Sequence, residues 1–252
     1  MHAEVKGTTL PTLEVSLEAG EAVVSTHGEL AWMTARLQMS QSLAGGGHKG
    51  LMAGLKRVVG GGGLFLTRYE AQGGSAQVTF AAKLPGRIFP VEIGPASNFL
   101  VHRHGWLCGT TDVVPSVGFQ HGFRSGMWGG DGFVLEKLEG TGTAWIELSG
   151  EITTYELAPG QTILAHPGHV GVFEGSVSFE MTRVPGIANK LFGGDGYYLV
   201  ALTGPGKIWL QSMPIAVLAQ ALEPYVASSA GGGVVAGGTA GGMLGDILGR
   251  NV

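Results

Sequence analysis

The sequence predicts an all-β protein in which three copies of one strand module form a closed, pseudo-threefold body. Three observations lead to this prediction. Glycine-rich loops recur at nearly constant spacing, and each is followed by an apolar strand. Apolar and polar residues alternate with the period of two that is typical of strands, rather than the period of 3.6 that is typical of helices. The chain is also rich in glycine and poor in charge, as expected for short strands joined by tight turns.

The composition limits the class of protein and the range of partners. The 252 residues include 46 glycines, and 44% of the residues are hydrophobic whereas 13% are charged. A single domain of this length can bury a sizeable core. The net charge of −4 and a pI near 6.0 argue against a basic surface for nucleic acid, so no DNA partner is expected. Because Cys108 is the only cysteine, an intramolecular disulfide is excluded, which fits a reducing compartment.

The first recurring element is a glycine-rich loop that leads into a strand. Its three copies contain GGGGLFL, GGDGFVL and GGDGYYL. The entry glycines are Gly63, Gly132 and Gly196, and their separations in the sequence are nearly equal (132 − 63 = 69 and 196 − 132 = 64). Such regular spacing indicates an internal repeat. A second strand follows each copy after a short glycine turn, so each copy predicts a β-hairpin.

The second recurring element is a pair of strands that also has three copies. These copies span Leu17–Leu30, Ile93–Leu107 and Leu157–Val170. In the first and third copies the leading Leu and the later Gly are eleven residues apart (28 − 17 and 168 − 157), and the middle copy slips by one residue. Their apolar residues alternate more than they follow a helical period, so strands are predicted.

The order of these elements along the chain predicts how the body closes. Half a module comes first, at residues 13–39, and the modules 63–119 and 130–183 follow. The other half module comes last, at residues 196–213. This hairpin is expected to pair beside the N-terminal strands, which completes the third module and removes exposed sheet edges. The three modules would form one β domain over residues 1–226.

The remaining segments predict short helices and a tail. Residues 50–59 are weakly helical, and Pro214–Leu222 predicts a C-terminal helix that stops before Pro224. Residues 227–252 are rich in Gly, Ala and Ser and predict a flexible tail. Core packing is expected for the five tryptophans because large aromatic side chains are mostly buried. They are Trp32, Trp106, Trp128, Trp145 and Trp209.

Several motifs, taken in order, resemble those of one protein family. They are the GLKR loop before a glycine-rich strand, the GGDG strand entries and the segment LAPGQTILAHPGHV. Together they resemble the altered-inheritance-of-mitochondria protein twenty-four family, over roughly residues 10 to 215. The resemblance implies a fold like that of the tryptophan RNA-binding attenuator, a double-stranded β-helix type with pseudo-threefold symmetry. Bacterial and archaeal members are of unknown function, and fungal members are associated with mitochondrial inner-membrane organisation. The family has no established catalytic residues, so the resemblance assigns none here.

The histidines support an enzymatic alternative, a cupin-like metal-binding enzyme. His102 and His104 form an HxH pair, and alternate residues of a strand face the same side. His166 or His169, from the equivalent part of the next module, would supply a third ligand. However, the glutamate of the cupin pattern is absent, and His27 recurs at the matching place in the N-terminal copy. A histidine whose ring bonds a turn carbonyl is therefore the favoured interpretation, and no metal or cofactor is assigned.

The sequence favours a binding role over catalysis. No Ser-His-Asp, Cys-His or paired-carboxylate pattern is evident, and Cys108 is interpreted as structural. We therefore predict a non-enzymatic scaffold or binding protein that is homo-oligomeric, and we assign no catalytic residue. RNA binding is a second alternative, which rests only on the analogy with the attenuator fold.

Two apolar segments predict weak docking to a lipid surface or to a protein partner. They are Leu51–Val59 and Met243–Leu248. The first combines apolar residues with Lys56 and Arg57, as contact with an anionic membrane surface requires. The competing interpretation is that this loop packs on the β-body or across an oligomer interface. We expect a cytoplasmic protein that can lie at the inner face of the membrane.

Overall fold

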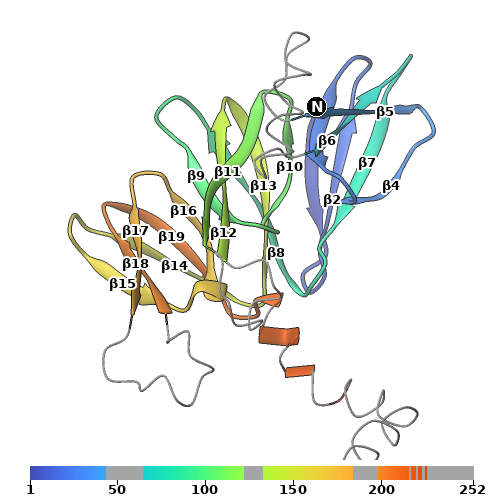
Figure 1. Ribbon diagram of the computed structural model, residues 1–252. Coiled ribbons are helices and arrows are strands. Elements are labelled where there is room, and N and C mark those ends of the chain that lie inside the picture. Colours follow the sequence, from blue (N-terminus) through green and yellow to red (C-terminus); the bar gives the residue numbers. More distant parts are fainter. Residues whose placement is uncertain are drawn as a thin grey trace, which may run out of the picture. The chain divides into compact units, whose positions relative to one another are not determined.

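A computed structural model of the chain describes residues 1–43, 65–121, 133–183, 198–215, 217–219, 221–222 and 225. The chain divides into two compact units, Met1–Pro214 and Ile215–Val252. Apart from the short 3-10 helix η2 (Pro167–His169), the regular structure described in the first unit consists of antiparallel strands (Figure 1). The described residues of the second unit are helical. Those up to Leu222 agree with the predicted C-terminal helix, whereas Tyr225 lies beyond the predicted stop before Pro224. The all-β class is therefore confirmed.

After the N-terminal strand β1 (His2–Lys6), the strands form three consecutive repeats of six. Repeat I contains β2 (Thr12–Leu17), β3 (Ala22–Thr26), β4 (Leu30–Met33), β5 (Leu37–Leu43), β6 (Phe65–Ala71) and β7 (Ala76–Ala81). Repeat II contains β8 (Gly86–Ile93), β9 (Phe99–His102), β10 (Trp106–Thr110), β11 (Val113–His121), β12 (Phe133–Gly140) and β13 (Gly142–Ser149). Repeat III contains β14 (Ile152–Leu157), β15 (Thr162–Ala165), β16 (Val170–Glu174), β17 (Ser178–Arg183), β18 (Tyr198–Thr203) and β19 (Gly206–Gln211).

All three repeats have the same strand pairing. The sixth strand of each repeat lies between the first and the third, as in β2–β7–β4, β8–β13–β10 and β14–β19–β16. The fifth strand lies between the second and the fourth, as in β3–β6–β5, β9–β12–β11 and β15–β18–β17. Each repeat therefore contributes three strands to each of two sheets. The internal repeat predicted from the glycine spacing is present in the structure.

Adjacent repeats are joined by one further strand pair, which we call a junction. At the first junction β3 of repeat I pairs with β10 of repeat II, and at the second junction β9 of repeat II pairs with β16 of repeat III. In both cases the second strand of one repeat pairs with the third strand of the next. The junctions create two six-stranded sheets, β5-β6-β3-β10-β13-β8 and β11-β12-β9-β16-β19-β14 (Figure 1).

A β-bulge recurs at the same place in the third strand of every repeat. The register against the sixth strand shifts between Leu30 and Trp32 in β4, between Trp106 and Cys108 in β10, and between Val170 and Val172 in β16. A bulge redirects the side chains that follow it. Since it lies at the same place in each repeat, it also identifies equivalent residues in the three repeats. Trp32, Cys108 and Val172 are therefore equivalent residues.

The core consists of three apolar clusters that extend across the junctions. In β2 burial follows the period of two, so that Leu13, Val15 and Leu17 are completely buried. Cys108 of repeat II belongs to the cluster of repeat I, and Val172 of repeat III belongs to the cluster of repeat II. Full burial of such a side chain contributes about 1.5–3 kcal/mol. Each repeat is thus stabilised partly by its neighbour.

The predicted boundaries of the modules are wrong. The repeats run over 12–81, 86–149 and 152–211, in step with the chain, and no half module is left at either end. The pairing predicted between 13–39 and 196–213 is absent, because β18 and β19 pair with β14 to β17. Spacing alone reveals the period of a repeat and leaves its starting point undetermined. Strands that are close in the sequence also pair more readily than distant ones. Among the described strands, no sheet closes into a ring.

The predicted glycine-turn hairpins are also wrong. In repeat II, β12 and β13 follow one another closely but belong to different sheets. Gly140 and Gly142 have φ angles of 106° and 136°, a region that L-residues with side chains rarely adopt. They turn the chain from one sheet into the other, as strands do at the corners of stacked sheets. The glycine turn therefore marks a corner rather than a hairpin.

Several expectations concern residues outside the described part of the chain. These are the loop 50–59, including Leu51–Val59, the GGDG entries, Trp128, Met243–Leu248 and the tail 227–252. The docking role of the two apolar segments therefore stays a prediction. Among the described residues, no helix has both the length and the apolar character needed to cross a bilayer.

Candidate functional site

A cluster of ionisable side chains lies at the first junction, and we call it the junction cluster. Its members come from both repeats and are Glu29, Lys83, His102, Glu136 and Glu147. Glu29 precedes β4, Lys83 follows β7, and the other three belong to β9, β12 and β13. The chain contains few charged residues, so this concentration of them at one place makes the cluster the principal candidate site.

Lys83 links two carboxylates of the junction cluster. Its Nζ donates to Glu29 Oε1 at 2.6 Å and to Glu147 Oε1 at 3.4 Å. The two carboxylate side chains are only 11% and 9% exposed, whereas the Lys83 side chain is 41% exposed. Glu147 also connects through its backbone, because its N–H donates to the carbonyl of Gly105 at 2.8 Å. Lys83 therefore bridges repeat I and repeat II from the edge of the cluster.

His102 and Glu147 each contain an enclosed atom without a hydrogen bond. Among the described residues, neither His102 Nε2 nor Glu147 Oε2 has a hydrogen-bond partner. The other ring nitrogen of His102, Nδ1, accepts a long hydrogen bond of 3.4 Å from the backbone N–H of His104. Unpartnered buried polar atoms destabilise a fold, by roughly 1–3 kcal/mol each.

Burial determines the protonation of the cluster. Burial lowers the pKa of His102 to about 3, and the charges of His104 and Lys83 act in the same direction, so the ring is neutral at pH 7. Burial raises the pKa of Glu136 to about 8 against the opposing charge of Arg103. Burial likewise raises the pKa of Glu147, although Lys83 opposes it. Glu136 is therefore mainly a protonated carboxyl group at neutral pH.

The pKa of Lys83 is not governed by burial alone, because its two partners are acids. Burial by itself lowers the pKa of Lys83, but its hydrogen bond to Glu29 and the charges of Glu147 and Glu29 outweigh burial. The pKa of Lys83 is therefore raised, and its ammonium group stays charged. A charged lysine between two acids is a stable donor and a poor general base. Chemically, the cluster is suited to holding the two repeats together.

At the second junction, neutral side chains occupy the corresponding positions. Gln211 is equivalent to Glu147, since both lie five residues after the glycine that opens the sixth strand. Its Oε1 accepts from the N–H of Ser149 at 3.0 Å, and its Nε2 donates to the carbonyl of Gly168 at 3.1 Å. His169 Nδ1 lies 2.7 Å from the carbonyl oxygen of Gln211. This junction is thus tied by hydrogen bonds that the Gln211 amide and the His169 ring make with backbone groups.

The structure places the histidines of the cupin-like alternative in two local segments. His102 ends β9 and His104 follows it, whereas His166 precedes η2 and His169 ends it, and the ring centroids of His166 and His169 are 5.7 Å apart. Among the described residues, no group of three or more His, Cys, Asp or Glu side chains could hold a metal ion. His169 bonds a carbonyl oxygen, but it is that of Gln211, 42 residues away, rather than one in its own turn as favoured from the sequence.

Cys108 and the tryptophans are placed by the strands that carry them. Cys108 is completely buried in β10, and burial raises the pKa of its thiol, which agrees with a structural role. Trp106 and Trp145 are buried, as predicted. Trp32 is 53% exposed, so the prediction of core packing is wrong for this residue. The reason is that β4 lies at the edge of its sheet.

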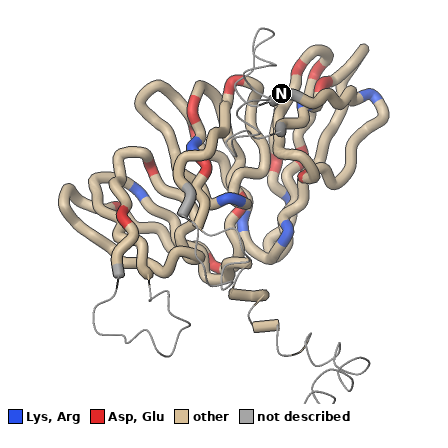
Figure 2. The backbone as a smooth tube through the Cα atoms, viewed as in Figure 1, with Lys and Arg blue, Asp and Glu red and all other residues tan. Residues whose placement is uncertain are grey.

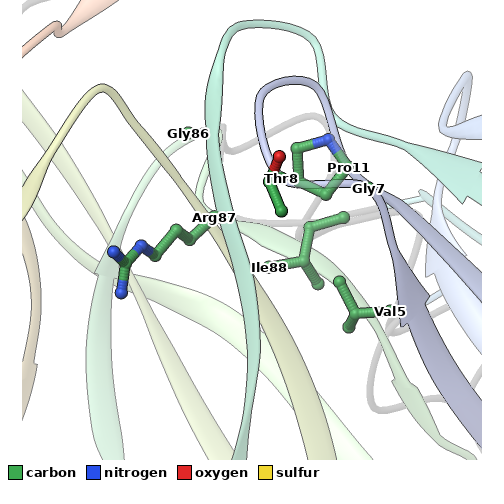
Figure 3. A pocket seen from close by; sticks show the side chains of 7 residues that line it. All are labelled: Val5, Gly7, Thr8, Pro11, Gly86, Arg87 and Ile88. Atoms are coloured by element: carbon green, nitrogen blue, oxygen red, sulfur yellow. The ribbon is translucent and has the colours of Figure 1, made fainter.

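A pocket of about 280 Å³ lies where the β1–β2 turn approaches β8 (Figure 3). Its lining comprises Val5, Gly7, Thr8, Pro11, Gly86, Arg87 and Ile88. Figure 3 shows the Arg87 side chain extending away from the apolar side chains of Val5, Pro11 and Ile88. With its one charged group turned aside, this lining offers no set of catalytic side chains.

The sequence did not reveal the junction cluster. Glu147 lies within the apolar run AWIEL, and a charged residue in such a run indicates a charge that is enclosed by the fold. Glu29 and Lys83 are 54 residues apart and follow no motif. Figure 2 shows acidic and basic residues interspersed along the described chain rather than gathered on one strand.

Two comparisons with known proteins identify relatives of the chain. The family model described as mitochondrial biogenesis AIM24 matches residues 3–213. A solved structure, that of protein SPYM3_0169 from Streptococcus pyogenes, is similar with a TM-score of 0.69 and 21% sequence identity. The similarity covers 89% of this chain and 99% of the streptococcal chain. At this identity the likeness concerns the fold. No curated protein matches the sequence.

Proposed function

Since this chain belongs to the AIM24 family of mitochondrial biogenesis proteins, we propose that it is a non-enzymatic scaffold or binding protein whose surfaces, rather than a catalytic centre, carry its function. The main observation is that Lys83, between repeats I and II, bonds the enclosed carboxylates of Glu29 in repeat I and Glu147 in repeat II. The scaffold consists of three similar β repeats that continue one another through shared sheets.

The equivalence of the two junctions supports a structural role for the cluster. Glu147 at the first junction and Gln211 at the second occupy the same position of the repeat and both bond across the junction. An acid that served in catalysis could not be replaced by an amide, because an amide neither gives nor takes a proton at neutral pH. A group that serves only to bond needs a suitable shape and a hydrogen bond, and both side chains provide these.

The pKa values of the cluster agree with this role. A general acid or base works best when its pKa lies near the working pH and when it reaches a substrate. The His102 pKa of about 3 is too low for that, and Lys83 is held as a charged donor by two acids. Glu136 has a pKa near 8, but it is 4% exposed, so a substrate has little access to it.

The proposal is tested by a search for catalysis in the purified full chain. Hydrolase, oxidoreductase and transferase substrates are supplied in turn with Mg²⁺, Mn²⁺, Fe²⁺ or Zn²⁺, and wild type is compared with His102→Ala and Glu147→Gln. We expect equal, background-level rates in all three proteins. Robust turnover in wild type that His102→Ala abolishes would overturn the proposal, provided that circular dichroism shows the variant to be folded. Glu147→Gln is the matched control because Gln already serves at the equivalent position 211.

A further inference from the structure

We propose that β15 of one copy of this chain pairs with β4 of a second copy, so that copies join head to tail and continue the series of repeats. The inference deepens the scaffold role and rests on it. It also specifies the surface behind the expected homo-oligomer.

The first step is the rule that both junctions follow. The second strand of a repeat pairs with the third strand of the next repeat, in β3–β10 and in β9–β16. Two strands of these types remain without such a pairing. Among the described strands, β15, the second strand of repeat III, pairs only with β18, and β4, the third strand of repeat I, pairs only with β7. Each is therefore of the type that the other lacks, and both lie at the edge of their sheets, on opposite sides of the view in Figure 1.

The second step is the register that the known junctions specify. At the second junction Leu100 lies opposite Phe173, and at the first junction Val24 lies opposite Gly109. Leu164 of β15 is equivalent to Leu100, because these two are as far apart in the sequence as the glycines that open β13 and β19 (164 − 100 = 206 − 142). The bulge makes Met33 of β4 equivalent to Phe173 and Gly109.

Both junctions therefore predict the same pairing. Leu164 of one copy lies opposite Met33 of the second copy, and Ala165 lies opposite Trp32. The second of these pairs corresponds to Val101 and Val172, which are opposite one another at the second junction. The new contact would thus be antiparallel and would repeat the register that is already used twice in the chain.

The third step is the exposure of these apolar side chains. Trp32, Met33 and Leu164 are 53%, 36% and 56% exposed. Their equivalents within the junctions are enclosed: Cys108, Val172 and Phe173 have no exposed surface. Of the two equivalents of Leu164, Val24 is only 6% exposed and Leu100 is partly buried. The apolar residues that a junction covers are therefore uncovered at the two free strands.

The composition of β4 and β15 also favours addition of another strand. Their sequences, LAWM and TILA, contain neither a charge nor a proline. Several other edge strands carry such protection, as Pro90 in β8, Pro115 in β11 and Lys6 in β1 illustrate. The edge strand β5, LQMSQSL, also lacks both, but it alternates apolar residues with Gln and Ser. Charges and prolines at sheet edges prevent unwanted pairing. Without them, the apolar edges of β4 and β15 can accept a further strand.

A second copy is the expected partner because β15 of one copy matches β4 of another. Neither strand matches a second copy of itself. A twofold dimer would place β4 against β4 or β15 against β15, which neither junction resembles. A contact between unlike surfaces joins copies head to tail, and it produces a ring or an open chain. In the described conformation β4 and β15 do not pair with each other, so both remain open to other copies.

The test measures mass in solution by analytical ultracentrifugation of the full chain, over a hundredfold range of concentration. Wild type is expected to form species larger than the 26.0 kDa monomer. Trp32→Lys and Leu164→Lys place a charge on one edge each, and both are expected to sediment as monomers, with association weakened at least about tenfold. Tyr155→Lys on β14, an exposed apolar residue of another edge strand, is the matched control and should assemble like wild type.

Mixing the two edge variants provides the decisive outcome. Trp32→Lys keeps an intact β15 and Leu164→Lys keeps an intact β4, so the mixture should form a one-to-one dimer and nothing larger. A wild type that stays monomeric at every concentration would overturn the proposal, and so would assembly that survives in both edge variants. Thermal unfolding of each variant shows whether it is folded, and these side chains are exposed in the monomer.

A cysteine pair distinguishes assembly from closure of one chain on itself. In the double variant Met33→Cys, Leu164→Cys, oxidation should link different copies and produce a ladder of covalent multimers. A disulfide formed within a single chain would contradict pairing between copies and indicate closure of the pseudo-threefold body instead. Neither result changes the expectation of background catalytic rates, so failure of this inference and failure of the scaffold proposal are distinguishable.

Discussion

The two junctions have the same strand pairing but differ in the side-chain contacts that stabilise it. At the first, the Lys83 ammonium bridges the carboxylates of Glu29 and Glu147, whereas at the second Gln211 bonds to backbone groups of Ser149 and Gly168. Strand pairing, register and bulge are alike in both. The repeat therefore determines the backbone geometry of both junctions, whereas the ion pairs of Lys83 with Glu29 and Glu147 belong to the first junction.

The ion pairs of the first junction change how strongly its stability depends on single side chains. A buried ion pair gains little over a neutral contact, because removing charges from water offsets most of the attraction between them. Once such a pair exists, however, the loss of one partner leaves the other charge enclosed without compensation. The first junction should therefore be much more sensitive to single substitutions than the second.

The largest expected effect follows from removal of the bridging ammonium. Lys83→Met leaves the carboxylates of Glu29 and Glu147 close together without a cation, and we expect the free energy of unfolding to fall by about 3 kcal/mol. Partial exposure of Lys83 keeps the loss below that of a fully buried pair. Urea denaturation at pH 7 measures it. A loss no larger than that of an ordinary surface ion pair, about 0.5 kcal/mol, would show that the bridge does not hold the junction.

The next effect concerns Glu136, which has the apolar Val200 as its equivalent in repeat III. The folded-state pKa of about 8 lies above the ordinary value of 4.5, so the folded state holds a proton that the unfolded state has lost. Stability due to this group is present below pH 4.5 and declines as pH rises toward 8. We expect Glu136→Gln to remove a loss of about 2 kcal/mol between pH 6 and pH 8.

His102 acts in the opposite direction at lower pH, so the two groups can be separated. Its pKa is lowered from 6.5 to about 3, and stability due to its neutral ring declines as pH falls from 6.5 toward 3. Denaturation curves of wild type and Glu136→Gln between pH 4 and pH 9 test both effects. If the two proteins lose stability equally between pH 6 and pH 8, the assignment to Glu136 is wrong.

A smaller effect is expected at the neutral junction. Gln211→Leu removes the hydrogen bonds to Ser149 and Gly168 without leaving a charge behind, and we expect a loss of about 1.5 kcal/mol. Chemical denaturation beside Lys83→Met measures the difference between the junctions directly. The comparison fails if Gln211→Leu destabilises the protein more than Lys83→Met does.

The smallest effect is expected when the first junction is made to resemble the second. Glu147→Gln removes an enclosed charge and weakens the contact with Lys83 at the same time, and these changes oppose each other. We expect the free energy of unfolding to change by less than about 1 kcal/mol. In the double variant Lys83→Met, Glu147→Gln, much of the stability lost in Lys83→Met should return, because one unpaired carboxylate is gone. Additive losses would mean that the two residues are not coupled.

The local features of this protein can be predicted from its sequence. Alternating apolar residues, as in TLEVSL at β2, predict strands because neighbouring side chains point to opposite sides of a sheet. The glycine spacing predicts three repeats, and the motifs predict the family that the comparison shows. A histidine bonded to a carbonyl oxygen was also predicted, but His169 bonds that of Gln211, 42 residues away, rather than a carbonyl of its own turn.

The pairing of the strands and the contacts between charged side chains depend on the tertiary structure. The period of a repeat is the same wherever the repeat is taken to begin, so the starting point at Thr12 required the observed pairing of β2 with β7. The turn after β12 contains glycines, which permit both a hairpin and a corner between sheets. Glu29, Lys83 and Glu147 meet because long-range pairing of strands brings them together, and the energy of that contact depends on burial that no short stretch of sequence contains.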